Sequence, residues 1–103
     1  MKAIYMKPAL LRYQQIILPI IVTYLPDAKI ILYGSRARGD DKPGSDIDIA
    51  LDMGEVIDRM QMINIISDLE DSDLPINFDL VDFNAVAADL QQQILKYGVV
   101  WKE

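Results

Sequence analysis

The stretch "LYGSRARGDDKPGSDIDIAL", residues 32–51, decides the fold and raises the question of function. Gly34 and Ser35 directly follow an apolar run, a polar turn comes next, and Asp46 and Asp48 then stand on either side of a single isoleucine. Two carboxylates this close together repel each other, and the repulsion costs folding free energy unless a cation balances it. We therefore ask what chemistry this acidic pair serves.

The residues of this stretch predict two strands joined by a turn. "AKIILY", residues 28–33, is short and rich in β-branched residues, which is typical of a buried strand. "GDDKPG", residues 39–44, is dense in turn formers. "SDIDIALD", residues 45–52, alternates polar and apolar residues with the period of a half-buried strand.

The aspartates of the second strand are candidate metal ligands. Because side chains alternate faces along a strand, Asp46 and Asp48 are predicted to share one face, roughly 6 to 7 Å apart. Carboxylate oxygens suit a hard divalent cation, Mg²⁺ first and Mn²⁺ second. Asp79 interrupts the apolar segment "INFDLVDF", residues 76–83, where a buried side chain is expected. It is therefore the candidate for a third carboxylate.

The residues after the first strand suggest a phosphate site. Gly34 has no Cβ, so backbone amides can approach a ligand closely there, and the amides that open the next helical turn favour an anion. Ser35 adds a hydroxyl donor. Arg36 and Arg38 either bind a polyphosphate or are surface charges that balance Asp40 and Asp41. We take Gly34, Ser35 and Arg36 as the candidate nucleotide-binding residues.

Each motif also has a purely structural interpretation. A D-x-D pair on a strand is more often the solvated face of a sheet than a metal site, and Gly-Ser after a strand is more often an ordinary turn. Asp52 and Asp82 are interpreted as such solvated residues. The functional interpretation depends on the turn and the acidic pair occurring together.

The flanking segments predict three helices. Leu11, Ile17 and Ile21 recur at near-helical spacing within residues 8–25, a segment that Pro19 should kink or divide. A second helix over residues 55–70 is predicted with one apolar face, and a third follows Asn84, which can cap it. The apolar face of the second helix comprises Val56, Met60, Ile63, Ile66 and Leu69.

The order of elements predicts a small α/β or α+β layer. Residues 75–83 are expected to form a third strand, and "VVWKE", residues 99–103, a short strand at an edge. With 103 residues, 51% of them hydrophobic, the chain can bury one modest core, so residues 1–103 are expected to form a single domain.

Composition excludes several classes of function. The chain has no cysteine and no histidine, which excludes thiolate or imidazole metal sites, imidazole bases and cysteine nucleophiles. A net charge of -6 argues against stable binding of nucleic acid. "IILPIIV", residues 16–22, is too short for a membrane span and has no cleavage site after it. We expect a cytoplasmic protein that does not enter a membrane.

The spacing of the motifs resembles that of a known family. Gly34-Ser35, ten further residues and then Asp46-Ile47-Asp48 form a pattern similar to the signature of the DNA polymerase β-type nucleotidyltransferases, with Asp79 downstream. The segments "GSRARGD", "SDIDI" and "FDLVD" are most similar to the minimal nucleotidyltransferases. The resemblance covers residues 28–101.

The resemblance implies a fold and a reaction. The fold is a small mixed sheet flanked by helices, like the palm of polymerase β, and the reaction moves a nucleoside monophosphate, AMP from ATP, to a hydroxyl. Asp46 and Asp48 would hold the Mg²⁺ of the triphosphate and, with Asp79, a second ion, whereas Gly34 and Ser35 would hold the β and γ phosphates. Asp79 would also help to remove the proton of the acceptor.

The resemblance also implies a partner. Minimal nucleotidyltransferases are similar to antitoxins that add AMP to a HEPN-domain toxin, and the domains with which larger relatives bind an acceptor do not fit into 103 residues. A HEPN-domain partner is therefore expected to supply the acceptor hydroxyl. Two alternatives stay open: a binding antitoxin with a vestigial site, and a transferase that acts on RNA or a small molecule. The sequence also leaves homo-oligomer formation open.

Overall fold

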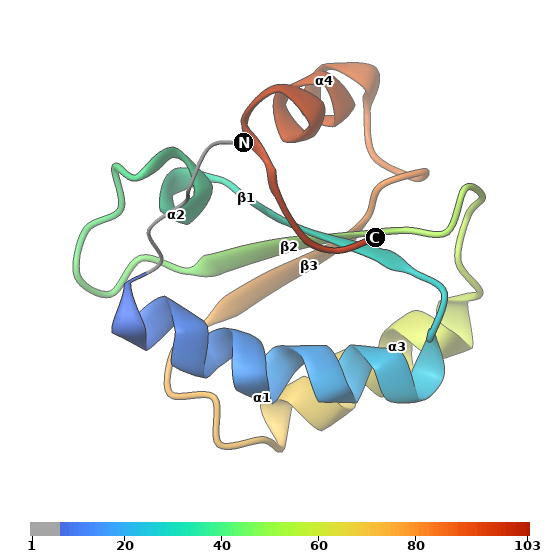
Figure 1. Cartoon of the computed structure of the whole chain (residues 1–103). Helices are drawn as coiled ribbons and strands as arrows, with labels where there is room; N and C mark the ends of the chain where they lie inside the picture. Colours follow the sequence, from blue (N-terminus) through green and yellow to red (C-terminus); the bar gives the residue numbers. More distant parts are fainter. Residues whose placement is uncertain (1–6) are drawn as a thin grey trace.

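The computed structural model describes residues 7–103, which form four strands and four helices (Figure 1). In chain order these elements are α1 (Pro8–Tyr24), β1 (Lys29–Tyr33), α2 (Ser35–Arg38), β2 (Ile47–Asp52), α3 (Arg59–Glu70), β3 (Phe78–Asp82), α4 (Ala88–Tyr97) and β4 (Val99–Lys102). The three predicted strands and the short strand at the C-terminal end are all present. No helix among residues 7–103 is long and apolar enough to cross a bilayer.

The four strands form one mixed sheet in the order β3-β2-β1-β4. β1 runs antiparallel to both β2 and β4, whereas β2 and β3 are parallel. The expected mixed sheet is therefore confirmed. β4 lies at one edge, as predicted for residues 99–103, and β3 lies at the other.

Helices cover both faces of the sheet. α1 and α3 lie together on one face, and α4 lies on the other (Figure 1). The larger core lies under α1 and α3 and includes the fully buried Ile17, Ile47 and Ile49. A smaller cluster on the opposite face centres on Ile31 and Ile94. Each such buried side chain contributes about 1.5 to 3 kcal/mol relative to an exposed one, so the two clusters fix the sheet between its helices.

α1 is a single helix, so Pro19 does not divide it. Pro19 removes one backbone donor, which leaves the carbonyl of Gln15 without its helical partner. Both residues are exposed, so water can reach that carbonyl. The predicted buried face is also offset by one residue at its start, because Leu10 is buried whereas Leu11 is 45% exposed.

α3 begins later than predicted, and its buried face agrees only in part with the predicted one. Asp58 is its N-cap, and the carboxylate accepts a hydrogen bond from the amide of Met60. The buried residues are Ile65 and Leu69, whereas Val56, Met60 and Ile63 of the predicted face are exposed. Of the predicted face, Leu69 is therefore confirmed as buried, whereas Val56 lies outside the helix.

Asp82 and Asn84 fix the loop that precedes α3. Contrary to the interpretation of Asp82 as solvated, it is only 8% exposed, and its carboxylate accepts hydrogen bonds from the amides of Ile57 and Asn84. The side-chain amide of Asn84 donates to Asp52 at 2.8 Å. Asn84 therefore does not cap α4, which begins at Ala88.

Candidate active site

Three side chains form a row across the sheet. Tyr33 at the end of β1 pairs with Asp48 of β2, and Asp48 pairs with Asp79 of β3. Residues that pair across neighbouring strands project to the same face. Ile47 and Ile49 belong to the core under α1 and α3, so the row lies on the opposite face, which α4 partly covers.

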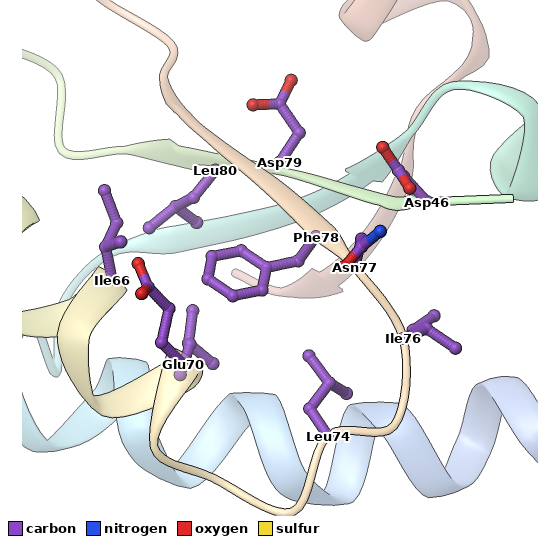
Figure 2. A pocket seen from close by; sticks show the side chains of 10 residues that line it. Asp46, Ile66, Glu70, Leu74, Ile76, Asn77, Phe78, Asp79 and Leu80 are labelled. Carbon is purple, nitrogen blue, oxygen red and sulfur yellow. The ribbon is translucent and has the colours of Figure 1, made fainter.

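Asp46 precedes the first residue of β2 and is exposed. Figure 2 shows its side chain and that of Asp79 on the side of the sheet away from α1. Alternation along β2 places Asp48 on this side as well. The structure thus brings the three predicted aspartates to one face, with Asp48 half-buried and the other two exposed.

Gly34 brings the turn after β1 directly against Asp48. Its backbone angles, φ 76° and ψ -157°, lie in a region that is open essentially to glycine alone. A Cβ at this position would overlap with Oδ2 of Asp48. Gly34 therefore satisfies two requirements at once, because it allows the turn and leaves room for the carboxylate.

α2 begins at Ser35, so its first amides point out of the turn. The carbonyl of Gly34 accepts hydrogen bonds from the amides of Ala37 and Arg38, which closes this short helical turn. The amides that open a helix have no partner within it and are suited to an anion. Ser35 and the turn are therefore adjacent to the aspartates, as a site for a metal-bound phosphate requires.

Arg36 and Arg38 are both bonded within the chain. The Arg36 guanidinium donates to the carbonyl of Ser45 at 2.7 Å and forms an ion pair with Asp41 at 3.5 Å. Arg38 pairs with Asp40 at 3.2 Å. These ion pairs agree with the interpretation that the two arginines balance Asp40 and Asp41, although Arg36 is largely buried and is not a surface charge. The assignment of Arg36 to nucleotide binding stays a prediction, and its internal bonds give it a second role in holding the loop before β2.

The surroundings of Asp48 oppose its negative charge. Burial raises the pKa of its carboxyl, and the negative charges of Asp79 and Asp46 raise it further. Arg38 and Arg36 act in the opposite sense but do not outweigh these effects. A cation that binds this face would remove the repulsion, so the electrostatics favour a positively charged ligand.

Tyr33 is a member of the site that the sequence patterns did not reveal. Its hydroxyl donates to Oδ2 of Asp79 at 3.3 Å. Burial, followed by the charges of Asp79 and Asp48, raises the pKa of this hydroxyl far above its ordinary value. Tyr33 therefore remains a neutral donor that orients Asp79. The available signal was its position immediately before Gly34, but only the strand register shows that it reaches Asp79.

The donor set fits a magnesium ion in its chemistry, although the site is not closed. Asp46, Asp48 and Asp79 offer only carboxylate oxygens, which Mg²⁺ prefers. However, no three acidic side chains among residues 7–103 lie close enough together to hold a metal ion as they stand. Mutual repulsion and the bond from Tyr33 to Asp79 both favour separation of the carboxylates.

Comparisons with known proteins agree with this geometry. The family described as "Polymerase beta, Nucleotidyltransferase" matches residues 15–103. The chain is 32% identical over 88 residues to a probable protein adenylyltransferase MntA of Haemophilus influenzae, and the match covers 85% of this chain and 77% of that protein.

Solved structures share the fold. A crystal structure of a toxin–antitoxin with AMP-PNP has a TM-score of 0.72 and 27% identity, over 87% of this chain and 73% of that one. An MNT antitoxin in complex with a tri-AMPylated HEPN toxin from Shewanella oneidensis has a TM-score of 0.69 and 24% identity, over 90% of this chain and 72% of that one. The second likeness shows the fold alone.

Proposed function

This chain belongs to the polymerase β nucleotidyltransferase family, and from that premise we propose that it transfers AMP from ATP to a hydroxyl of a partner protein. We further propose that the partner is a HEPN-domain toxin and that the chain acts as its antitoxin. The observation that carries the proposal is the row of Tyr33, Asp48 and Asp79 beside the Gly34 turn. In this proposal the turn and Asp48 would serve a metal-bound triphosphate, and the Asp79 carboxylate would serve the acceptor.

The proposed reaction forms one bond and breaks another. The acceptor oxygen bonds to the α-phosphorus of ATP, the bond from this phosphorus to the bridging oxygen of the β-phosphate breaks, and pyrophosphate leaves. Two bound Mg²⁺ ions would stabilise the attacking and leaving oxygens. Asp46 and Asp48 would hold the triphosphate-bound ion, and both would share the second with Asp79. The Asp79 carboxylate, oriented by Tyr33, would take the hydroxyl proton.

The relatives support the acceptor and the partner in this proposal. The Haemophilus influenzae protein is described as a probable protein adenylyltransferase, and the first toxin–antitoxin structure was solved with AMP-PNP. The HEPN toxin bound to the Shewanella oneidensis antitoxin carries AMP groups. A protein acceptor also agrees with the net charge of -6, which repels an RNA backbone.

A contact inhibitor without catalysis is the second candidate. No three acidic side chains within residues 7–103 lie close enough together to hold a metal ion, and this open arrangement favours the second candidate. The half-buried charge of Asp48 disfavours it, because a protein that acts by contact alone gains nothing from this cost.

The first prediction separates these two candidates by mass spectrometry of the partner. When the HEPN-domain partner is mixed with this protein and MgATP, it should gain the mass of one or more AMP groups. Asp79→Asn should slow the gain by at least about 100-fold, because the acceptor loses its base. Asp27→Asn, in the exposed turn before β1, is the matched control and should leave the rate unchanged. Full neutralisation of the partner by the Asp79→Asn protein, with no AMP attached, would establish contact inhibition instead.

A further inference from the structure

We propose that a groove along the free edge of β3 binds an extended, positively charged segment of the acceptor protein, which adds to the sheet next to Asp79. The proposal rests on the function proposed above and specifies how the acceptor is recognised. Three observations carry it: the outer edge of β3, which no strand among residues 7–103 covers, the shape of the groove beside it, and the sign of the charges that line it.

β3 is an edge strand whose outer main chain is available for pairing. The carbonyl of Asn77 accepts from the amide of Ile47, and the amide of Phe83 donates to the carbonyl of Leu51. Odd-numbered residues of this segment therefore face β2. Because main-chain groups alternate in direction along a strand, those of Phe78 and Leu80 face outward. An exposed edge of this kind can pair with an extended segment of another protein.

An open groove of about 730 Å³ runs beside this edge. Its apolar lining comes from the end of α3, the loop that follows and β3 itself, as Figure 2 shows. The apolar lining residues are Ile66, Leu69, Leu74, Ile76, Phe78 and Leu80. Asp46 and Asp79 line the same groove. A segment that lies along β3 would therefore bury apolar side chains and bring a hydroxyl to Asp79.

The charges in the groove select a basic segment. Its charged lining residues are Asp46, Glu70 and Asp79, all of them acidic. Glu70 ends α3, its carboxylate faces the groove (Figure 2), and it forms no ion pair among residues 7–103. A lysine or arginine of the bound segment would compensate Glu70, the one of these three carboxylates that the proposed metal ions do not neutralise, whereas Glu70 would repel a nucleic-acid strand.

Charge reversal of Glu70 tests the recognition step. Glu70→Lys should weaken binding of the acceptor protein at least tenfold, as measured by isothermal titration calorimetry, and raise the KM for the acceptor while kcat at saturation stays near the wild-type value. Lysine suits the last turn of a helix, so the fold should tolerate this change. Glu55→Lys, on the exposed β2–α3 loop, changes the net charge equally and should bind like the wild type.

Amide exchange tests the added strand itself. On addition of the acceptor protein, the amides of Phe78 and Leu80 should exchange at least tenfold more slowly, because they gain hydrogen bonds. The amides of Asp79 and Val81, which already face β2, should change much less. Unchanged exchange of Phe78 and Leu80 in the complex, or equal affinities for Glu70→Lys and Glu55→Lys, would overturn the proposal.

The same samples distinguish this proposal from the proposed function. AMP transfer to the acceptor by the wild type, without protection of the β3 edge, would overturn the groove alone. Protection of the edge without any AMP transfer would support the groove and overturn the enzymatic function.

Discussion

At the scale of single residues, the charge of Asp48 carries an electrostatic cost. It is half-buried, it pairs in register with Asp79, and Asp46 lies two residues away. Burial and the two neighbouring charges raise the pKa of its carboxyl. Such a cost is typical of functional sites, where stability is given up for ligand binding.

Substitution of Asp48 should therefore separate stability from activity. Asp48→Asn keeps the shape of the side chain and removes the unfavourable charge, so the free energy of unfolding of the unliganded protein should rise by about 0.5 to 2 kcal/mol at pH 7. AMP transfer should be lost. Urea denaturation measures the first effect and the transfer assay the second. An Asp48→Asn protein that unfolds at lower urea than the wild type would indicate that Asp48 has a structural role.

The difference in unfolding free energy between Asp48→Asn and the wild type should depend on pH, in a sense set by the raised pKa of Asp48. A carboxyl whose pKa is raised in the folded state binds its proton more tightly there, so the wild type is relatively more stable below the ordinary value of 3.8. The stability that the protonated Asp48 contributes to the wild type is lost as the pH rises through the raised pKa. The gain from Asp48→Asn should therefore shrink steadily as the pH is lowered from 7 toward 4. If the stability gain from Asp48→Asn instead grows as the pH is lowered, a titratable group other than Asp48 determines the pH dependence of the difference.

Single residues also show what a sequence pattern can and cannot reveal. Asp46 and Asp48 were identified as an acidic pair on one face of a strand, and Asp79 because it interrupts a strand where an apolar residue is expected. Tyr33 was not, because a tyrosine at the end of an apolar strand is ordinary until the register brings it to Asp79. Asp82 was misjudged because its partners are backbone amides, one of them in a distant loop.

At the scale of elements, the turn from β1 to α2 connects the proposed phosphate site to the aspartates. Gly34 is the contact point, since its backbone approaches the Asp48 carboxylate more closely than any residue with a Cβ could. Gly44, in the loop before β2, also has a positive φ, of 83°, but a Cβ there would meet nothing within 4 Å. The two glycines therefore share a positive φ but differ in their surroundings.

This pair provides a matched test of the turn. Gly44→Ala should cost about 1 to 2 kcal/mol of stability from the left-handed backbone alone and leave AMP transfer intact. Gly34→Ala should cost more, because the Asp48 side chain must also move, and transfer should fall by at least about 100-fold. Thermal denaturation and the transfer assay measure the two effects. Equal loss of activity in both variants would show that the contact with Asp48 is not required.

The elements themselves were predicted to different degrees. Strands β1 to β3 were identified because their apolar periods and flanking turn formers agree. The predicted start of α3 was wrong. The backbone amide of Ile57, in the segment before the helix, donates a hydrogen bond to the Asp82 carboxylate, and a sequence pattern does not reveal this tertiary contact. Asn84 resembles a helix cap in the sequence, but its side chain bonds to Asp52 across the fold.

At the scale of the whole molecule, the candidate site depends on strand order. The parallel pairing of β2 with β3 brings Asp48 next to Asp79, and the antiparallel pairing of β1 with β2 adds Tyr33. Within residues 7–103, the order β3-β2-β1-β4 also places β3 at the edge of the sheet, beside the acidic groove. Residue patterns identify strands but not their neighbours, so neither Tyr33 nor the groove could be predicted before the sheet was assembled.

The final prediction concerns the stability of the whole protein with nucleotide. Because the carboxylates repel one another and do not form a closed metal site, the divalent ion and the triphosphate should bind together and only weakly apart. At a ligand concentration about 100 times Kd, binding adds about 2.7 kcal/mol to the free energy of unfolding. For a chain of this size that corresponds to a rise in Tm of roughly 10 to 20 °C.

Differential scanning calorimetry with four samples tests this coupling. MgATP should give the full rise in Tm, whereas Mg²⁺ alone, and ATP with EDTA, should each give only a small part of it. The Asp48→Asn protein should start from a higher Tm, because one repelling charge is gone. It should gain little from MgATP, because the metal ion loses one of its proposed carboxylate ligands. Asp27→Asn should behave like the wild type. The same rise with ATP in EDTA would show that the nucleotide binds without a metal ion, and the assignment of Asp46, Asp48 and Asp79 as metal ligands would then be wrong.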